Sequence, residues 1–172
     1  MEIGFGVGQA IAAMAEANPD KNYLGVEVYS PGVGALLMQC QERELENVRI
    51  IQASVWNVLS RQVADASLSQ INIFFPDPWP KTRHFKRRLL QVAFLELLAK
   101  KLVPRGRVYL ATDWEDYAQW ALKMFSHVPA FTNIAEREFI PRYDARPLTR
   151  FEQRGLKLGH EVRDLCFQRS AD

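Results

Sequence analysis

Short apolar runs alternate along this chain with longer amphipathic ones, and this alternation constrains the fold more than any other feature. The apolar runs are rich in Val, Ile, Leu, Tyr and Phe and are bounded by Gly, Pro, Asn or Asp, which is typical of buried strands. They occupy residues 1–5, 23–28, 48–52, 71–75 and 107–112. Helical periodicity occupies residues 8–17, 34–44, 88–102 and 114–126. The pattern predicts an α/β fold in which helices cover both faces of a parallel sheet.

The chain is expected to form a single domain over residues 1–172. Its length is that of one domain, and no repeat or low-complexity tract divides it. Beyond residue 127 the alternation fades. Residues 140–150 form a loop with two prolines and three arginines, and residues 162–169 are expected to be a last strand.

Composition excludes several classes of protein. Hydrophobic residues make up 48% of the chain and charged residues 24%, which excludes collagen-like and disordered proteins. No apolar run approaches the roughly 20 residues of a membrane span, and no signal-peptide core follows Met1. Cys40 and Cys166 stand far apart without the spacing of a metal site or a disulfide framework. We therefore expect a cytoplasmic protein with neither a metal nor a membrane partner.

Charge is distributed unevenly along the chain. Residues 1–75 contain 4 Lys/Arg against 8 Asp/Glu, whereas residues 76–172 contain 18 against 12. A basic second half indicates a polyanionic partner, although an ordinary solvated basic face would give the same balance.

A glycine-rich loop follows the first expected strand and opens the first helix. Gly4, Gly6 and Gly8 allow the tight turn that brings a ligand against backbone N–H groups at a helix N-terminus. Glu27 closes the second strand, where a carboxylate can accept hydrogen bonds from both ribose hydroxyls. The GxGxG spacing differs from the GxGxxG of dinucleotide enzymes. Together these residues indicate a nucleoside-cofactor site, with a plain strand–helix turn as the alternative.

Two carboxylates stand at the carboxyl ends of the fourth and fifth strands, the edge where open α/β sheets bind ligands. Asp77 lies between two prolines that restrict its backbone, and Trp79 beside it could stack on a base. The alternative is a rigid turn in which Trp79 is a hydrophobic plug. Asp113 precedes Trp114 and could equally cap the following helix.

A compact basic segment follows Lys81. It has an aromatic residue among its cations, as contact with a phosphate backbone requires, and cations at a helix N-terminus oppose the helix dipole. The alternative is a solvated helix start. The segment consists of Arg83, His84, Phe85, Lys86, Arg87 and Arg88. A second basic set consists of Arg137, Arg142, Arg146, Arg150, Arg154 and Lys157.

The motifs together resemble the bacterial tRNA (guanine-N7-)-methyltransferases, which are class I enzymes that use S-adenosylmethionine. The resemblance covers essentially the whole chain and implies a Rossmann-like, mostly parallel seven-stranded sheet whose last strand is antiparallel. The specific motifs are FFPDPW, at residues 74–79, and TRFEQRG, at residues 149–155. The supporting ones are EIGFGVG, GVEV and ATDW, at residues 2–8, 25–28 and 111–114.

The resemblance also implies roles for individual residues. Asp77 would be catalytic and would lie where cofactor and substrate meet. The cofactor would contact Glu2, Gly4, Gly6, Gly8, Glu27, Ser54 and Asp77. The substrate guanosine would contact Lys81, Asp113, Thr149, Arg150, Phe151 and Glu152, within a substrate-facing loop and turn at residues 136–160. Residues 83–88 would contact RNA, and we expect a monomer or a weak homodimer.

Two features depart from the family pattern. Ser54 stands where the family usually has an acid facing the adenine amino group, so weaker cofactor binding is expected. Family members also carry a substantial segment before the glycine motif, whereas Met1 here lies in the first strand itself. An RNA-binding protein of this fold with lost catalysis is therefore one alternative. Another is an amino-group methyltransferase, although the second proline of its Asp-Pro-Pro-aromatic signature is missing here.

Overall fold

The structure is a computed structural model that describes residues 1–171, in which the strands form one sheet in the order β3-β2-β1-β4-β5-β7-β6. Neighbouring strands from β3 to β5 are parallel, and β7 is antiparallel to both β5 and β6. The predicted Rossmann-like methyltransferase sheet with an antiparallel last strand is confirmed. The strands are β1 (Glu2–Ile3), β2 (Tyr23–Glu27), β3 (Val48–Gln52), β4 (Leu68–Phe74), β5 (Leu102–Thr112), β6 (Phe131–Asn133) and β7 (Arg163–Arg169).

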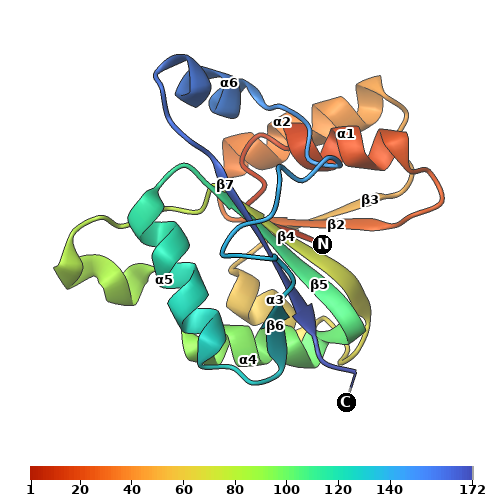
Figure 1. Ribbon diagram of the computed structural model, residues 1–172. Helices are drawn as coiled ribbons and strands as arrows, with labels where there is room; N and C mark the ends of the chain where they lie inside the picture. Colours follow the sequence, from red (N-terminus) through yellow and green to blue (C-terminus); the bar gives the residue numbers. More distant parts are fainter. Residues whose placement is uncertain (172) are drawn as a thin grey trace.

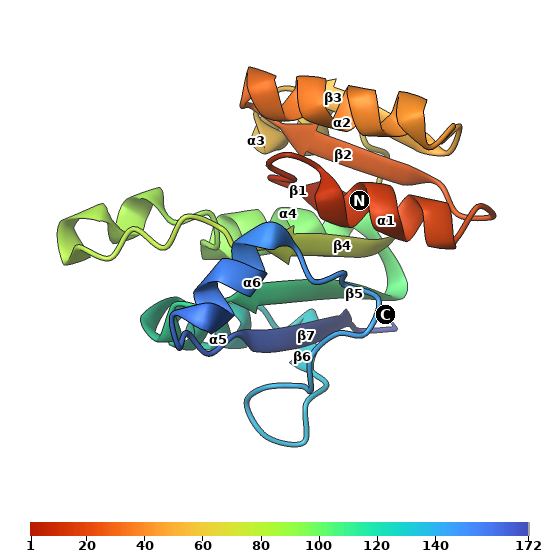
Figure 2. The same cartoon turned by 90° about the horizontal axis from the view of Figure 1, so that it is seen from above.

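Helices cover both faces of this sheet. One face carries α1 and α2, and the other carries α3, α4 and α5 (Figure 1). Seen from above, α6 lies on the same face as α1, across the carboxyl ends of β4 and β5 (Figure 2). The helices are α1 (Gln9–Ala17), α2 (Ser30–Glu42), α3 (Val55–Arg61), α4 (Val92–Lys101), α5 (Glu115–Ser126) and α6 (Arg150–Lys157), and η1 (Thr82–Arg87) is a 3-10 helix.

The central strands are apolar on both sides because both sides are covered. In β4, Ile71 and Ile73 face the cluster formed with α3, α4 and α5, whereas Phe74 packs in a second cluster with residues of α1. A third cluster joins α1 and α2 around Ile11 and Leu36. None of the helices in residues 1–171 is long and apolar enough to cross a membrane.

Several elements differ from the prediction. The third expected helix begins at Val92 instead of residue 88, because the basic segment before it forms η1. The fifth strand begins at Leu102 and continues through Pro104, with a register shift against β4. Helix α3 and the three-residue strand β6 were missed, since their sequences are too short to show a period. The expected turn at 149–152 is the start of α6.

The order of the strands reverses between β1 and β4, which points to the site. Chain connections leave β1 towards β2 on one side and leave β4 towards β5 on the other. The loops after β1 and β4 therefore diverge at the carboxyl edge of the sheet and leave a crevice there.

Candidate active site

The glycine loop after β1 has a backbone that only glycine adopts easily. Gly4, Gly6 and Gly8 have φ angles of 70°, 57° and 77°, in the left-handed region. Gly8 precedes α1, and a Cβ there would lie 2.7 Å from the side chain of Leu36. The loop therefore needs glycine both for its turn and for its contact with α2.

Glu27, at the end of β2, is held beside this loop by backbone hydrogen bonds. One carboxylate oxygen accepts a hydrogen bond from the Gly6 N–H at 2.8 Å. The other accepts from the N–H groups of Val28 at 2.7 Å and Tyr29 at 3.1 Å. These bonds hold the carboxylate at the crevice, where the sequence predicts a ribose-binding acid.

Three adjoining cavities occupy the crevice. The largest, 490 Å³, lies between the glycine loop, Glu27 and the loop that carries Asp77 and Trp79. A second, of 240 Å³, is lined by Glu2, the glycine loop, Phe75, Thr149 and Phe151 from α6 and its approach. A third, of 130 Å³, lies between Glu27 and the start of α3. The structure thus brings predicted residues from four segments, the glycine loop, the end of β2, the Asp77 loop and the start of α6, to one edge.

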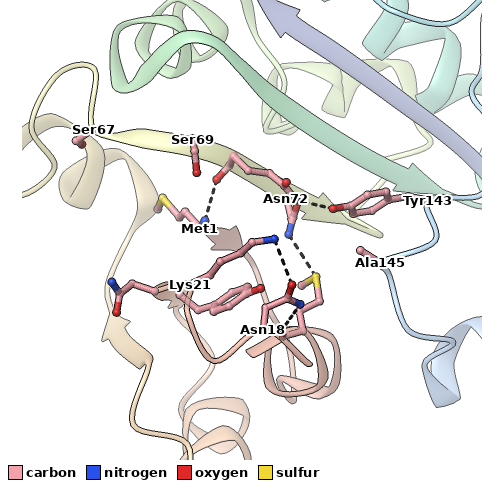
Figure 3. A pocket seen from close by; sticks show the side chains of 12 residues that line it. Met1, Asn18, Lys21, Ser67, Ser69, Asn72, Tyr143 and Ala145 are labelled. Carbon is pink, nitrogen blue, oxygen red and sulfur yellow. Dashed lines mark hydrogen bonds between the residues drawn. The ribbon is translucent and has the colours of Figure 1, made fainter. Parts of the chain in front are cut away.

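A further cavity, of 450 Å³, opens at the opposite edge of the sheet (Figure 3). Amide and hydroxyl groups line much of it, among them Asn18, Asn72 and Tyr143 (Figure 3). It includes none of the individually predicted site residues, although Tyr143 and Ala145 belong to the segment 136–160 that is expected to face the substrate, so part of that segment lies at the opposite edge. The candidate active site is the crevice at the carboxyl edge.

Glu2 is the most unusual group in the crevice. Its side chain is buried, and its Oε2 atom has no hydrogen-bond partner among the described residues. Burial raises the pKa of its carboxyl to about 8. A buried carboxylate without a partner is costly, so this position suits a ligand that brings a positive charge or a hydrogen-bond donor.

Glu2→Gln is expected to flatten the pH dependence of stability in the ligand-free protein. The pKa of Glu2 rises from an ordinary 4.5 to about 8, so between these values the folded state holds a proton that the unfolded state lacks. The free energy of unfolding contributed by this group therefore falls as pH rises across that range, by up to about 1.4 kcal/mol per pH unit. Urea titrations of both proteins test this, and identical pH profiles would show that Glu2 is solvated.

The loop after β4 is held in a strained shape. Phe75 and Trp79, on either side of Asp77, have φ angles of 52° and 43°, which bulky residues rarely adopt. The Phe75 N–H donates to the carbonyl of Ala111 at 2.7 Å, which fixes the loop to β5. Asp77 itself is exposed at the mouth of the largest cavity. Strain of this kind is concentrated at functional sites.

The start of α6 closes the crevice from the α1 side. Thr149 caps the helix by accepting from the Glu152 N–H at 3.2 Å, and the Arg150 N–H donates to Gln9 of α1 at 3.2 Å. The ring of Phe151 packs against Phe75, with centroids 5.1 Å apart. Phe75 belongs to the FFPDPW motif, but the sequence alone did not predict that its side chain lines the site.

Asp113 does not cap the helix after β5. The residue that precedes α5 is Trp114, whose N–H donates to the Thr112 hydroxyl at 3.2 Å. The Asp113 carboxylate instead contacts Nδ1 of His160 at 3.0 Å, which ties β5 to the segment after α6. The helix-cap alternative is therefore wrong, and the role of Asp113 in guanosine binding stays a prediction.

Glu152, which is predicted to contact the guanosine, is buried in the structure. Its side chain is 1% exposed and is paired with Arg146 and Arg142. Arg146 is also buried and pairs with Asp164 of β7 at 2.8 Å. These pairs anchor α6 to the sheet, and the role of Glu152 in guanosine binding stays a prediction.

Arg88, which is predicted to contact RNA, differs in the structure from the other cations of its segment. Arg83, Lys86 and Arg87 of the basic segment are exposed, as RNA contact requires, whereas the Arg88 side chain is 0% exposed. His84 and Phe85 are half-buried. Arg88 cannot reach a phosphate in this structure, because its guanidinium is enclosed by aromatic rings.

Two further predicted residues lie near the crevice without lining it. Ser54 is exposed at the start of α3, next to the smallest cavity, and makes no capping bond. Lys81 is exposed between the Asp77 loop and η1. Their roles towards cofactor and substrate stay predictions.

Solved structures with the same fold include several methyltransferases and the [4+2]-cyclase SpnF, which superposes with a TM-score of 0.66 at 14% identity. The 16S rRNA methyltransferase KamB superposes with a TM-score of 0.68 at 14% identity, covering 98% of this chain and 86% of that one. A SAM-dependent methyltransferase from Aquifex aeolicus superposes with a TM-score of 0.66 at 10% identity, covering 98% and 80%. At these identities the likeness concerns the fold alone.

Sequence relatives are more specific. A family described as "Putative methyltransferase" matches residues 1–165. The tRNA (guanine-N(7)-)-methyltransferase of Hydrogenovibrio crunogenus is 52% identical over 170 residues, which cover 98% of this chain and 71% of the relative. The enzyme of the same name from Thiobacillus denitrificans is 53% identical over 169 residues, covering 98% and 74%. This chain belongs to the tRNA (guanine-N(7)-)-methyltransferase family.

Proposed function

We propose that this protein transfers a methyl group from S-adenosylmethionine to N7 of a guanine in the variable loop of tRNA. The observation that carries the proposal is the crevice itself. A glycine loop, a locked carboxylate at Glu27 and the Asp77 loop surround one cavity, in a chain about half identical to enzymes of that name.

The residues present fit the proposed cofactor. Glu27 would accept from the ribose hydroxyls, and the left-handed glycine loop leaves room for close approach of a ligand. The unpartnered, buried Oε2 of Glu2 would receive the cofactor's ammonium group, which supplies the missing donor and charge. Ser54, exposed at the edge of the smallest cavity, would contact the adenine without a charge.

Asp77 would act through its charge and its position. Bound S-adenosylmethionine supplies an electrophilic methyl group, and guanine N7 already presents a lone pair, so no base is needed to remove a proton. Positive charge develops on the purine as N7 is methylated, and a carboxylate beside the ring stabilises it. The Asp77 oxygens would also accept from guanine N–H donors and so orient the base, and this orientation accounts for much of the rate.

The exposed cations of η1 would bind the phosphate backbone of tRNA beside the crevice. Arg83, Lys86 and Arg87 project on a segment that extends away from the sheet (Figure 2). A loop nucleotide presents its base edge to such a site without unpairing a duplex. With tRNA as substrate, the protein would work in the cytoplasm, as a monomer or weak homodimer.

Methyl transfer from labelled S-adenosylmethionine to unmodified tRNA tests the proposal. Label in 7-methylguanosine is expected. Label in another nucleoside would overturn the assignment to guanine N7. If no label appears, titration with the cofactor separates an RNA-binding protein that has lost catalysis from one that cannot bind the cofactor.

Arg83→Gln is expected to weaken tRNA binding and to reduce its dependence on salt. Each phosphate contact releases counterions, so losing one lowers the slope of log K against log salt by about one. Fluorescence anisotropy of labelled tRNA at several salt concentrations measures this. Arg61→Gln, an exposed cation in the last turn of α3, is the matched control. Equal slopes for both variants would remove the basic segment from the interface.

A further inference from the structure

We infer that Arg88 is a positioning residue that holds the catalytic Asp77 loop, and that it does not contact RNA. The inference rests on the proposed function only in naming Asp77 as the catalytic residue. Arg88 directly follows η1, and its side chain is buried, whereas Arg83, Lys86 and Arg87 are exposed. Arg87 also lies over the Trp79 ring, 5.0 Å from its centroid, and lines the largest cavity of the crevice.

Three contacts fix the Arg88 guanidinium under the loop. Its Nε donates to the carbonyl of Pro78, the residue after Asp77, at 2.9 Å. Its Nη2 pairs with the carboxylate of Asp116 in the first turn of α5. Its Cζ lies 3.7 Å from the centroid of the Phe85 ring. One side chain therefore joins the loop after β4 to the helix after β5.

The contacts of Arg88 with Pro78 and Asp116 connect the two segments that carry the predicted site carboxylates Asp77 and Asp113. Asp113 lies just before α5, so a tie between Pro78 and Asp116 sets the distance between the Asp77 and Asp113 segments. Proline has no backbone N–H and cannot donate a hydrogen bond. The backbone of Pro78 can therefore be anchored only through its carbonyl. Arg is suited to this task because its planar fork donates in two directions while it stacks on rings.

The surroundings of Arg88 explain why its charge is kept. The rings of Phe85, Trp120 and Tyr117 enclose it, with centroids 3.7, 5.0 and 5.5 Å from Cζ. Its Nη1 and the nearby Tyr117 hydroxyl are buried without partners among residues 1–171. Replacing a whole buried ion pair by apolar residues is often neutral for stability, and the partner here, Asp116, has a side chain that is 58% accessible. The pair is therefore weak evidence for a role in folding, and the guanidinium is better explained by the loop that it holds.

Asp77 lies close enough to this cluster to influence it. Burial raises the pKa of Tyr117 above its ordinary value, and the Asp77 carboxylate raises it further.

The test compares Arg88→Met with Lys86→Met, which removes an exposed cation from the same segment. Arg88→Met is expected to lower the single-turnover methylation rate about 100-fold at saturating tRNA and cofactor, because small displacements of catalytic groups have effects of this size. Its Kd for tRNA and its salt slope should stay within twofold of wild type. Lys86→Met should weaken tRNA binding and lower the salt slope by about one. Lys123→Met, which removes an exposed cation of α5 outside the site, should leave rate and binding unchanged.

Hydrogen exchange of the backbone provides a readout that needs no activity. In Arg88→Met the amide of Phe75, which donates to the carbonyl of Ala111, should exchange faster, and in Lys86→Met it should not. Asp116→Asn removes the exposed end of the tie, where the side chain is 58% accessible and can be solvated without unfolding. It should reproduce the faster exchange, and it carries the test if Arg88→Met does not fold.

Two results would overturn the inference. Arg88→Met could show the binding defect of Lys86→Met with an unchanged rate, which would make Arg88 an RNA contact. Alternatively, rate and exchange could both stay at wild-type values, which would show that the loop holds its shape without Arg88. A wild-type protein that makes no 7-methylguanosine would refute the proposed function, and the exchange data would still decide the role of Arg88.

Discussion

Asp77→Asn is expected to slow methyl transfer by about 100- to 1,000-fold while leaving the Kd of the cofactor within a few-fold of wild type. The neutral amide removes the negative charge that stabilises the purine as it becomes positive, a loss of the size seen when one electrostatic contact is removed from an active site. Asp77 is exposed at the cavity mouth, so this substitution has little effect on folding. Single-turnover rates at saturating tRNA and a separate cofactor titration measure the two quantities.

Asp20→Asn is the control for this prediction, since Asp20 is exposed in the turn after α1, beside Asn18 and Lys21, which line the cavity at the opposite edge of the sheet. It should leave both quantities unchanged. Equal losses of rate and cofactor affinity in Asp77→Asn would show that Asp77 is chiefly a cofactor ligand. A loss of tRNA affinity alone would show that it only orients the substrate.

Gly32→Ala is expected to abolish cofactor binding at concentrations that saturate the wild-type protein. Gly32 is buried in the first turn of α2, and a Cβ there would lie 2.0 Å from the carbonyl oxygen of Gly6. Backbone cannot yield by that amount locally, so the glycine loop must shift away from Glu27, whose carboxylate accepts from the Gly6 N–H. Overpacking of this kind also lowers stability by about 1–3 kcal/mol.

Gly34→Ala is a matched control in the same helix. A Cβ at Gly34 meets no described atom within 4 Å, and Ala is favoured over Gly in a helix by about 1 kcal/mol. This variant should bind the cofactor normally and unfold at a higher urea concentration. Isothermal titration and urea denaturation of both variants test the pair. Normal binding by Gly32→Ala would show that the glycine loop tolerates displacement.

The α/β class, the glycine loop and the acids at the strand ends could be predicted from the sequence. Buried strands need unbroken apolar runs, and left-handed turns need glycine, so both leave local marks that can be read without a structure. The same reasoning placed Glu27 and Asp77 at the carboxyl edge, because parallel strands bring their ends together. Helix α3 and strand β6 left no such mark, because seven and three residues are too few to show a period.

Only the tertiary structure decided which of several similar charged residues are buried. Arg88 looks like Arg87 beside it, and Glu152 looks like any acid near a helix start, yet both are buried. Their partners, Asp116 for Arg88 and Arg146 for Glu152, lie on other elements. The sequence by itself determined the backbone that makes the crevice, because backbone requirements are local. Whether a charged side chain is exposed or is buried in an ion pair depends on contacts between distant segments, and only the folded chain brings these segments together.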